Sequence, residues 1–349
     1  MPEDPDLWNI GFKFKPEAKP ATREVLSDRE IFLSYDWVYK PTQVFGGQPI
    51  SLDIKEEDDF EVETVKFANG AFTRIPKEPN TGGANFRGFN YCQDVGALVL
   101  DKDGMITDFA LADGITMTTN GTAAARRAAF FGVSVLRSDQ VKWSEDGMKK
   151  MLLEVEGKMQ DFDVEKTRLK WAETVRKDSR MGPGMAENLL NRMGYVISDG
   201  KLIKQESEQS KEYGAEIMGS TTLTLGHLEG NNLHMVYAAD GGYIVVSRSG
   251  VVKVYGGEHE RSAPPQLSLA GRKVPESDIK YVKLELSAGD VVMVFTDGLY
   301  HGNGEPKEIA RRAADLLKQG QSLEQISEEL LQNSAGSDDN SLLVFTYKG

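Results

Sequence analysis

From Asn90 to the end of the chain, short apolar segments alternate with turn residues such as Gly and Asn. The apolar segments are rich in β-branched and aromatic residues, and this pattern predicts buried β-strands. Short strands that follow one another through tight turns are typical of antiparallel sheets. The predicted strands are Val95–Asp101, Met105–Ala112, Ser220–Leu228, Leu233–Ala239, Tyr243–Ser247, Val251–Tyr255, Tyr281–Leu286, Val291–Thr296 and Leu342–Tyr347.

Apolar residues recur at helical spacing between these groups of strands. Helices are expected at Thr122–Leu136, in two amphipathic stretches between residues 148 and 175, and twice before the last strand. Ser322 and Gln325 have the spacing of a capping box at the start of the final helix. Residues Arg180–Met185 are expected to form a loop, and the polar stretch Ser198–Tyr213 a flexible flap. Because no βαβ rhythm repeats, the order of elements predicts an α+β fold.

Composition narrows the class of protein. The chain is 40% hydrophobic, and no apolar run approaches the roughly 20 residues that a membrane helix needs. A net charge of −13 argues against nucleic acid as a partner. The acidic N-terminus does not resemble a signal peptide, and Cys92, the single cysteine, has no partner for an internal disulfide. We therefore expect a cytoplasmic protein without membrane spans.

The chain divides at about residue 85. Residues 1–85 contain scattered prolines and aromatic clusters, which predict an N-terminal extension of short strands packed on the main domain. Residues 86–349 form the main domain, in which a helical or flap insertion is expected around residues 139–215.

Aspartates mark the ends of the predicted strands. Such residues can converge on one edge of a sheet even though they are distant in the sequence. Two or three convergent carboxylates form an oxygen-only site that suits Mg²⁺ or Mn²⁺ better than zinc. The four aspartate segments are Gln93-Asp94, Ala112–Gly114, Thr296–Leu299 and Ser337–Ser341.

The order of five segments resembles the metal-dependent protein phosphatases of type 2C, including their bacterial sporulation-type branch. The five segments are Cys92–Asp94, Ala112–Gly114, Gly219–Thr222, Ala288–Leu299 and Asp338–Ser341. The resemblance implies two antiparallel β-sheets packed face to face and flanked by helices, an α-β-β-α sandwich. It also implies a phosphoric monoester hydrolase that uses two Mn²⁺ or Mg²⁺ ions.

By the same resemblance, Asp113 would bridge the two cations, and the Gly114 carbonyl would bind one of them. Asp297 and Asp338 would complete the metal site, and Asp94 would act mostly through metal-bound waters. A hydroxide that bridges the two cations would attack phosphorus.

The ligand in the last segment is a choice between two neighbouring carboxylates, Asp338 and Asp339. Asp338 is preferred because Ser341 then falls where the family has Thr.

Three positions depart from the family pattern. The His that would protonate the leaving group corresponds to Ile115, and the Arg that grips phosphate falls on Phe89. Arg87 is nearby, and two roles stay open for it: binding the substrate phosphate, or an exposed salt bridge. The Gly-Asp pair of the central hairpin reads Asp240-Gly241, so a third metal site is not expected. Without a general acid, phosphoserine should be hydrolysed more slowly than activated esters.

The leading hypothesis is a cytoplasmic, metal-dependent serine/threonine phosphatase with a role in signalling, in which Asp113, Asp94 and Arg87 take part in catalysis. Its partner would be a phosphorylated protein. Two alternatives stay open: a pseudophosphatase that serves as a regulatory protein-binding module, and a phosphatase of a small phosphoester. Retention of Asp113, Asp297 and Asp338 favours an enzyme, because convergent buried carboxylates are costly without a role.

Overall fold

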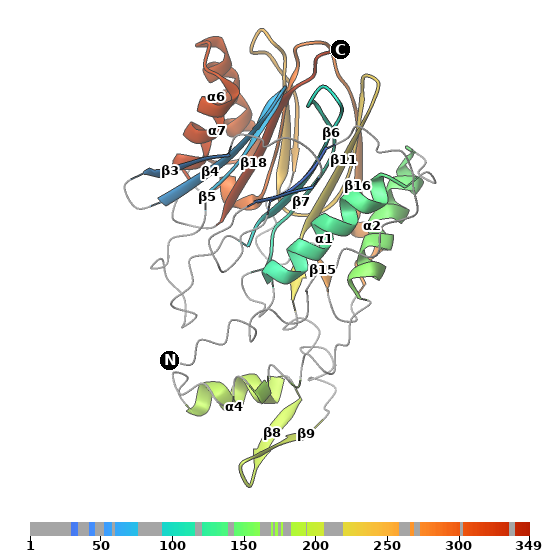
Figure 1. Ribbon diagram of the computed structural model, residues 1–349, viewed down its shortest axis with the longest axis vertical. Coiled ribbons are helices and arrows are strands. Elements are labelled where there is room, and N and C mark those ends of the chain that lie inside the picture. Colours follow the sequence, from blue (N-terminus) through green and yellow to red (C-terminus); the bar gives the residue numbers. More distant parts are fainter. Residues whose placement is uncertain are drawn as a thin grey trace.

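Two antiparallel β-sheets form the centre of the protein in the computed structural model (Figure 1). Each has seven strands, and the chain crosses between the sheets several times. The structure describes residues 29–33, 42–45, 52–57, 60–75, 93–115, 121–138, 143–160, 169, 172–173, 176, 183–192, 194–205, 219–257, 266–268, 273–300, 303–334 and 339–349.

Both sheets combine strands from distant parts of the sequence. The first sheet, sheet A, has the strand order β16 (Lys280–Glu285), β12 (Asn232–Ala238), β11 (Leu223–Glu229), β7 (Ile106–Ala112), β6 (Val95–Leu100), β1 (Arg29–Leu33) and β2 (Thr42–Phe45). The second, sheet B, has the order β14 (Val252–Gly257), β13 (Gly242–Val246), β17 (Val291–Phe295), β18 (Asn340–Thr346), β5 (Gly70–Ile75), β4 (Phe60–Phe67) and β3 (Leu52–Glu57).

Helices cover the outer face of each sheet (Figure 1). On sheet A, α1 (Gly121–Leu136) and α2 (Glu145–Met159) bury their apolar faces against β7, β11 and β12. On sheet B, α6 (Pro306–Lys318) and α7 (Leu323–Gln332) pack against β13, β14, β18 and β5. Smaller elements are β10 (Ser220–Thr221), β15 (Leu267–Ser268), η2 (Glu276–Asp278) and η3 (Asp297–Tyr300).

The inner faces of the two sheets share a third apolar core. Because side chains alternate along a strand, each central strand supplies one face to the helices and the other to this inter-sheet core. Phe109 of β7 and Phe345 of β18 meet there with ring centroids 6.2 Å apart. Both rings are almost completely buried. The result is a helix–sheet–sheet–helix arrangement, which confirms the expected fold class.

Most predicted elements are present close to their expected bounds. The expected helix Thr122–Leu136 is α1, and Ser322 and Gln325 form the expected capping box at the start of α7. One prediction around residues 180–213 was wrong, and another is tested only over residues 198–205. The expected loop Arg180–Met185 contains the start of α4 (Pro183–Arg192), where a proline suits the first helical turn.

The expected flap Ser198–Tyr213 begins with a β-hairpin that sequence analysis did not predict, and residues 206–213 lie outside the described residues. Strands β8 (Tyr195–Ser198) and β9 (Lys201–Lys204) pair in register around Asp199-Gly200. Both turn residues have positive φ, +50° and +71°, and the dipeptide Asp-Gly is a strong signal for such a turn. The high polarity of the segment concealed this signal.

The leading residues contribute strands to both sheets. β1 pairs with β6 in sheet A, and β5 pairs with β18 in the middle of sheet B. The proposed division at residue 85 and the insertion around residues 139–215 stay predictions. Of the helices among the described residues, none combines the length and apolar character that a membrane crossing requires.

Candidate metal centre

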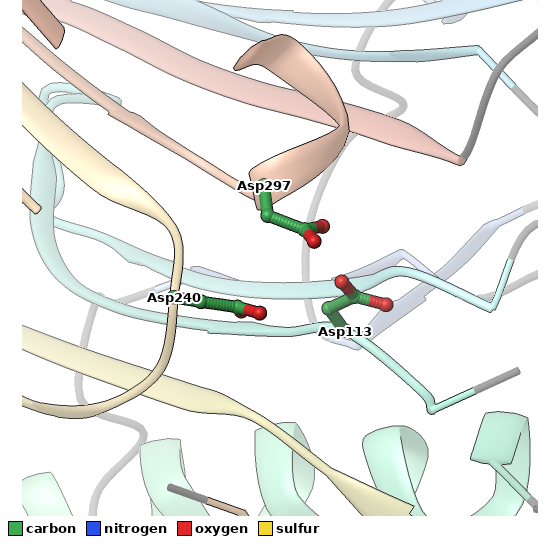
Figure 2. A group of neighbouring side chains, drawn as sticks. All are labelled: Asp113, Asp240 and Asp297. Atoms are coloured by element: carbon green, nitrogen blue, oxygen red, sulfur yellow. The ribbon is translucent and has the colours of Figure 1, made fainter. Parts of the chain in front are cut away.

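Three aspartates from separate parts of the chain converge at one end of the two sheets. Asp113 follows β7, Asp240 lies in the turn from β12 to β13, and Asp297 follows β17. One carboxylate oxygen from each lies within 4.8 Å of those of the other two. Figure 2 shows the three side chains turned toward a common space. Because β12 belongs to sheet A and β13 to sheet B, Asp240 sits where the chain passes between the sheets.

The backbone around Asp113 is fixed by the start of the next sheet A hairpin. The Thr222 amide donates to the Asp113 carbonyl at 2.9 Å, and the Asp113 amide donates to the Thr222 hydroxyl at 3.2 Å. The Thr221 hydroxyl also donates to the Asp113 carbonyl, at 2.7 Å. Gly114 forms an isolated antiparallel bridge with Thr221. The Gly219–Thr222 segment therefore fixes the backbone at Asp113. The hydroxyl groups of Thr221 and Thr222 have a structural role in this contact.

Asp297 begins a short 3₁₀ turn directly after the buried strand β17. The next residue must be small, because a Cβ at Gly298 would collide with the Asp339 carbonyl oxygen and the Asn340 side chain. This close approach brings the turn that carries Asp297 against the residues that open β18. The glycine of the Thr-Asp-Gly segment thus lets two acidic segments approach each other.

Asp94 is fully buried at the start of β6. Thr296 donates its hydroxyl to Asp94 Oδ2 at 2.8 Å. Burial, followed by the negative charge of Asp339, raises the pKa of Asp94 to about 8, and a hydrogen bond with the Asp113 side chain lowers it in part. Asp94 is therefore adjacent to Asp113, and its burial disfavours the charged form of the carboxyl group.

The chemistry of this cluster fits a hard divalent cation. All three side chains offer carboxylate oxygens, and Asp240 is only 7% exposed. Asp297 Oδ1 is buried and has no hydrogen-bond partner among the described residues. A buried carboxylate oxygen without a donor is costly unless a cation satisfies it. Oxygen-only donors suit Mg²⁺ and Mn²⁺.

The structure brings together some of the residues expected from the sequence. Asp113 and Asp297 converge as expected, and Asp94 lies beside Asp113. Arg87 and Asp338 fall outside the described residues. Asp339 is buried, and its Oδ2 accepts a hydrogen bond from the Gln93 amide at 2.8 Å. The choice between Asp338 and Asp339 as a ligand stays a prediction, as does a role for the Gly114 carbonyl.

Asp240 is the residue that sequence reasoning missed. It was considered only as a departure from the family's Gly-Asp pair, yet its carboxylate lies in the cluster. The available signal was the same as for the other aspartates, an Asp directly after a predicted strand. Its place in a predicted hairpin turn did not indicate that the turn lies near the ends of β7 and β17.

A model of the family described as Protein phosphatase 2C matches residues 81–343, which is most of the chain. The chain belongs to the protein phosphatase 2C family. Membership confirms the resemblance seen in the sequence motifs. It also confirms the expected function at the level of the family, a metal-dependent protein phosphatase. A search of curated proteins gave no match to this chain.

Solved structures with the same fold share little sequence with this chain. The photosystem II phosphatase PBCP is 14% identical, with a TM-score of 0.50 over 81% of this chain and 99% of that one. RsbX in complex with magnesium is 14% identical, with a TM-score of 0.43 over 85% and 100% of the two chains. The catalytic domain of the serine/threonine phosphatase PstP, in complex with two manganese ions, is 13% identical, with a TM-score of 0.44 over 82% and 99%.

Proposed function

We propose that this phosphatase hydrolyses phosphoserine or phosphothreonine in a partner protein, at a site built on Asp113, Asp240 and Asp297. The observation that carries this proposal is the convergence of these three carboxylates within 4.8 Å. Asp94, the Gly114 carbonyl and one of Asp338 and Asp339 complete the proposed ligand set. When bound, two divalent cations would activate water and neutralise charge on the phosphoryl oxygens.

The chain's own residues prepare this site before any cation arrives. Thr221 and Thr222 hold the Asp113 turn rigid through its carbonyl and amide. Rigid ligands lower the entropy cost of assembling a metal site and keep the carboxylates at a fixed spacing. Asp240 adds a third negative charge, which strengthens attraction for a divalent cation over a monovalent one.

Residue 115, where the family resemblance expects a proton donor to the leaving group, has no side chain that can donate a proton. Ile115 stands where the family resemblance places a proton-donating His, and its backbone is fixed by a 2.9 Å bond from its amide to the Ser220 carbonyl. An alkyl side chain cannot donate a proton. We therefore propose that activated esters are turned over faster than alkyl phosphates.

We also propose a cellular location, a class of partner and a role for Arg87. A cytoplasmic location is supported by the single cysteine, which is compatible with a reducing compartment. The family of the chain supports a role in signalling, with either a phosphorylated protein substrate or a regulatory protein as the partner. Arg87 is proposed to bind the substrate phosphate.

The test is hydrolysis of para-nitrophenyl phosphate and of a phosphothreonine peptide with Mn²⁺, in the wild type and in Asp113→Asn, Asp240→Asn and Asp297→Asn. Each variant should lose activity by about 100-fold or more, since even changes outside the ligand shell cost about 10–100-fold. Asp315→Asn is the matched control, because Asp315 is exposed on α6 and pairs only loosely with Lys318.

Two outcomes would contradict the proposal. If Asp240→Asn kept full activity and Mn²⁺ affinity, Asp240 would not be a ligand. If the wild type bound Mn²⁺ but hydrolysed neither substrate, the pseudophosphatase alternative would replace the enzyme.

A further inference from the structure

We infer that Thr296 is a positioning residue, whose hydroxyl orients the Asp94 carboxylate toward the acidic cluster from the opposite sheet. This inference rests on the proposed function of the cluster and adds a residue to it. Thr296 directly precedes Asp297. The same turn therefore supplies the Asp297 carboxylate to the cluster and orients the Asp94 carboxylate.

The Thr296 hydroxyl lies at the centre of a short hydrogen-bond relay. It accepts a bond from the Ser341 amide at 3.0 Å and donates to Asp94 Oδ2 at 2.8 Å. The Thr296 amide in turn donates to the Ser341 carbonyl at 3.1 Å. The Ser341 amide can only donate, so the hydroxyl oxygen accepts there and its own proton is available for Asp94 Oδ2. The relay therefore has one direction, and it ends on the carboxylate.

Two further contacts fix the backbone that carries Asp94. The fully buried Arg74 donates from Nη1 to the Asp94 carbonyl at 3.2 Å. Asp339 Oδ2 accepts from the Gln93 amide at 2.8 Å. Arg74, Thr296 and Asp339 all belong to or flank strands of sheet B, whereas Asp94 opens β6 of sheet A. Three contacts from one sheet thus hold a short segment of the other.

This arrangement determines which Asp94 oxygen can serve the site. Thr296 occupies Oδ2, whereas Oδ1 is buried and has no hydrogen-bond partner among the described residues. A fully buried carboxylate with one oxygen committed has little freedom to rotate. Residues that orient a ligand in this way commonly affect metal affinity by about 10–100-fold. The functional consequence is that assembly of the site depends on the packing of the two sheets.

The experiment compares Thr296→Val, which removes the hydroxyl at constant shape, with Thr296→Ser, which keeps it. Mn²⁺ affinity is measured by titration calorimetry, and stability without metal by urea unfolding. We expect Thr296→Val to weaken Mn²⁺ binding by about tenfold or more, and Thr296→Ser to restore it to near the wild-type value. Thr64→Val is the matched control, because it removes a buried hydroxyl bond to Thr73 elsewhere in sheet B.

A double-mutant cycle of Thr296→Val with Asp94→Asn, measured by unfolding without metal, tests the contact itself. Non-additive stability changes support the inference, and additive ones overturn it. Unchanged Mn²⁺ affinity in Thr296→Val would also overturn it. If the wild type bound no Mn²⁺ while the cycle showed coupling, the proposed function would fail, but the Thr296–Asp94 contact would stand.

Discussion

The indole ring of Trp143 lies flat on the imidazole ring of His227, with ring centroids 3.4 Å apart and an interplanar angle of 8°. His227 Nδ1 also lies 2.6 Å from Asp108 Oδ1. Trp143 directly precedes Ser144, the N-cap of α2, whereas His227 and Asp108 belong to paired strands of sheet A. The stacked rings therefore fasten the start of α2 to the sheet.

Replacing Trp143 with Ala should destabilise the fold. The loss of the stack and of part of the apolar burial should lower the free energy of unfolding by about 2 kcal/mol. Urea unfolding measures this change. Trp143→Phe, which keeps a flat ring, should recover much of the loss, and equal stabilities of the Ala variant and the wild type would show that the stack contributes nothing.

Stability should fall as the pH drops below the ordinary His pKa, partly because of His234. Burial, and then the charge of Lys283, lowers the pKa of His234 below its usual 6.5. The unfolded chain then binds a proton at a higher pH than the folded protein does, so acidification below pH 6.5 favours unfolding. Other charged or titratable neighbours of this imidazole are Glu229, His227 and Tyr281.

Unfolding curves of the wild type and His234→Asn above and below pH 6.5 test this prediction. On acidification, the free energy of unfolding should fall less in the variant than in the wild type. Parallel pH profiles for the two proteins would assign the acid sensitivity to other groups.

Gly298→Ala should disrupt the metal centre more than the fold as a whole. The new methyl group would collide with the Asp339 carbonyl oxygen and move the turn that carries Asp297. We expect Mn²⁺ affinity and phosphatase activity to fall by about tenfold or more, by analogy with the loss of residues that orient a ligand.

The matched control for this change is Gly157→Ala in α2, where a Cβ would meet nothing within 4 Å. Since Ala is favoured over Gly in helices by up to about 1 kcal/mol, this variant should be slightly more stable and equally active. Equal activity of Gly298→Ala and the wild type would mean that the turn tolerates displacement.

Ile115→His should change substrate preference rather than fold. A proton donor at this position should raise kcat/KM for a phosphothreonine peptide by about tenfold or more, while para-nitrophenyl phosphate, which has a good leaving group, should change little. Ile115→Leu serves as the size control. An equal effect on both substrates would mean that His at this position does not act on the leaving group.

The local pattern of the sequence determined the elements of this fold well. Helical spacing of apolar residues predicted α1, and short apolar runs predicted the central strands, such as β6 and β17, which are buried on both faces. The Asp-Gly turn at Asp199-Gly200 carried a hairpin signal that the surrounding polar residues outweighed in our interpretation. Asp113 and Asp297 were predictable because each follows a strongly apolar strand.

Only the tertiary structure decided which other residues join them. Asp240 enters the cluster because the β12–β13 turn crosses from sheet A to sheet B, and that crossing depends on strand order. Thr296 contacts Asp94 across 202 positions of sequence, and Arg74 reaches the same residue from β5. A local pattern indicates that a strand is buried, but it carries no information about which strand lies alongside. The packing of the two sheets supplies that information, and with it the composition of the site.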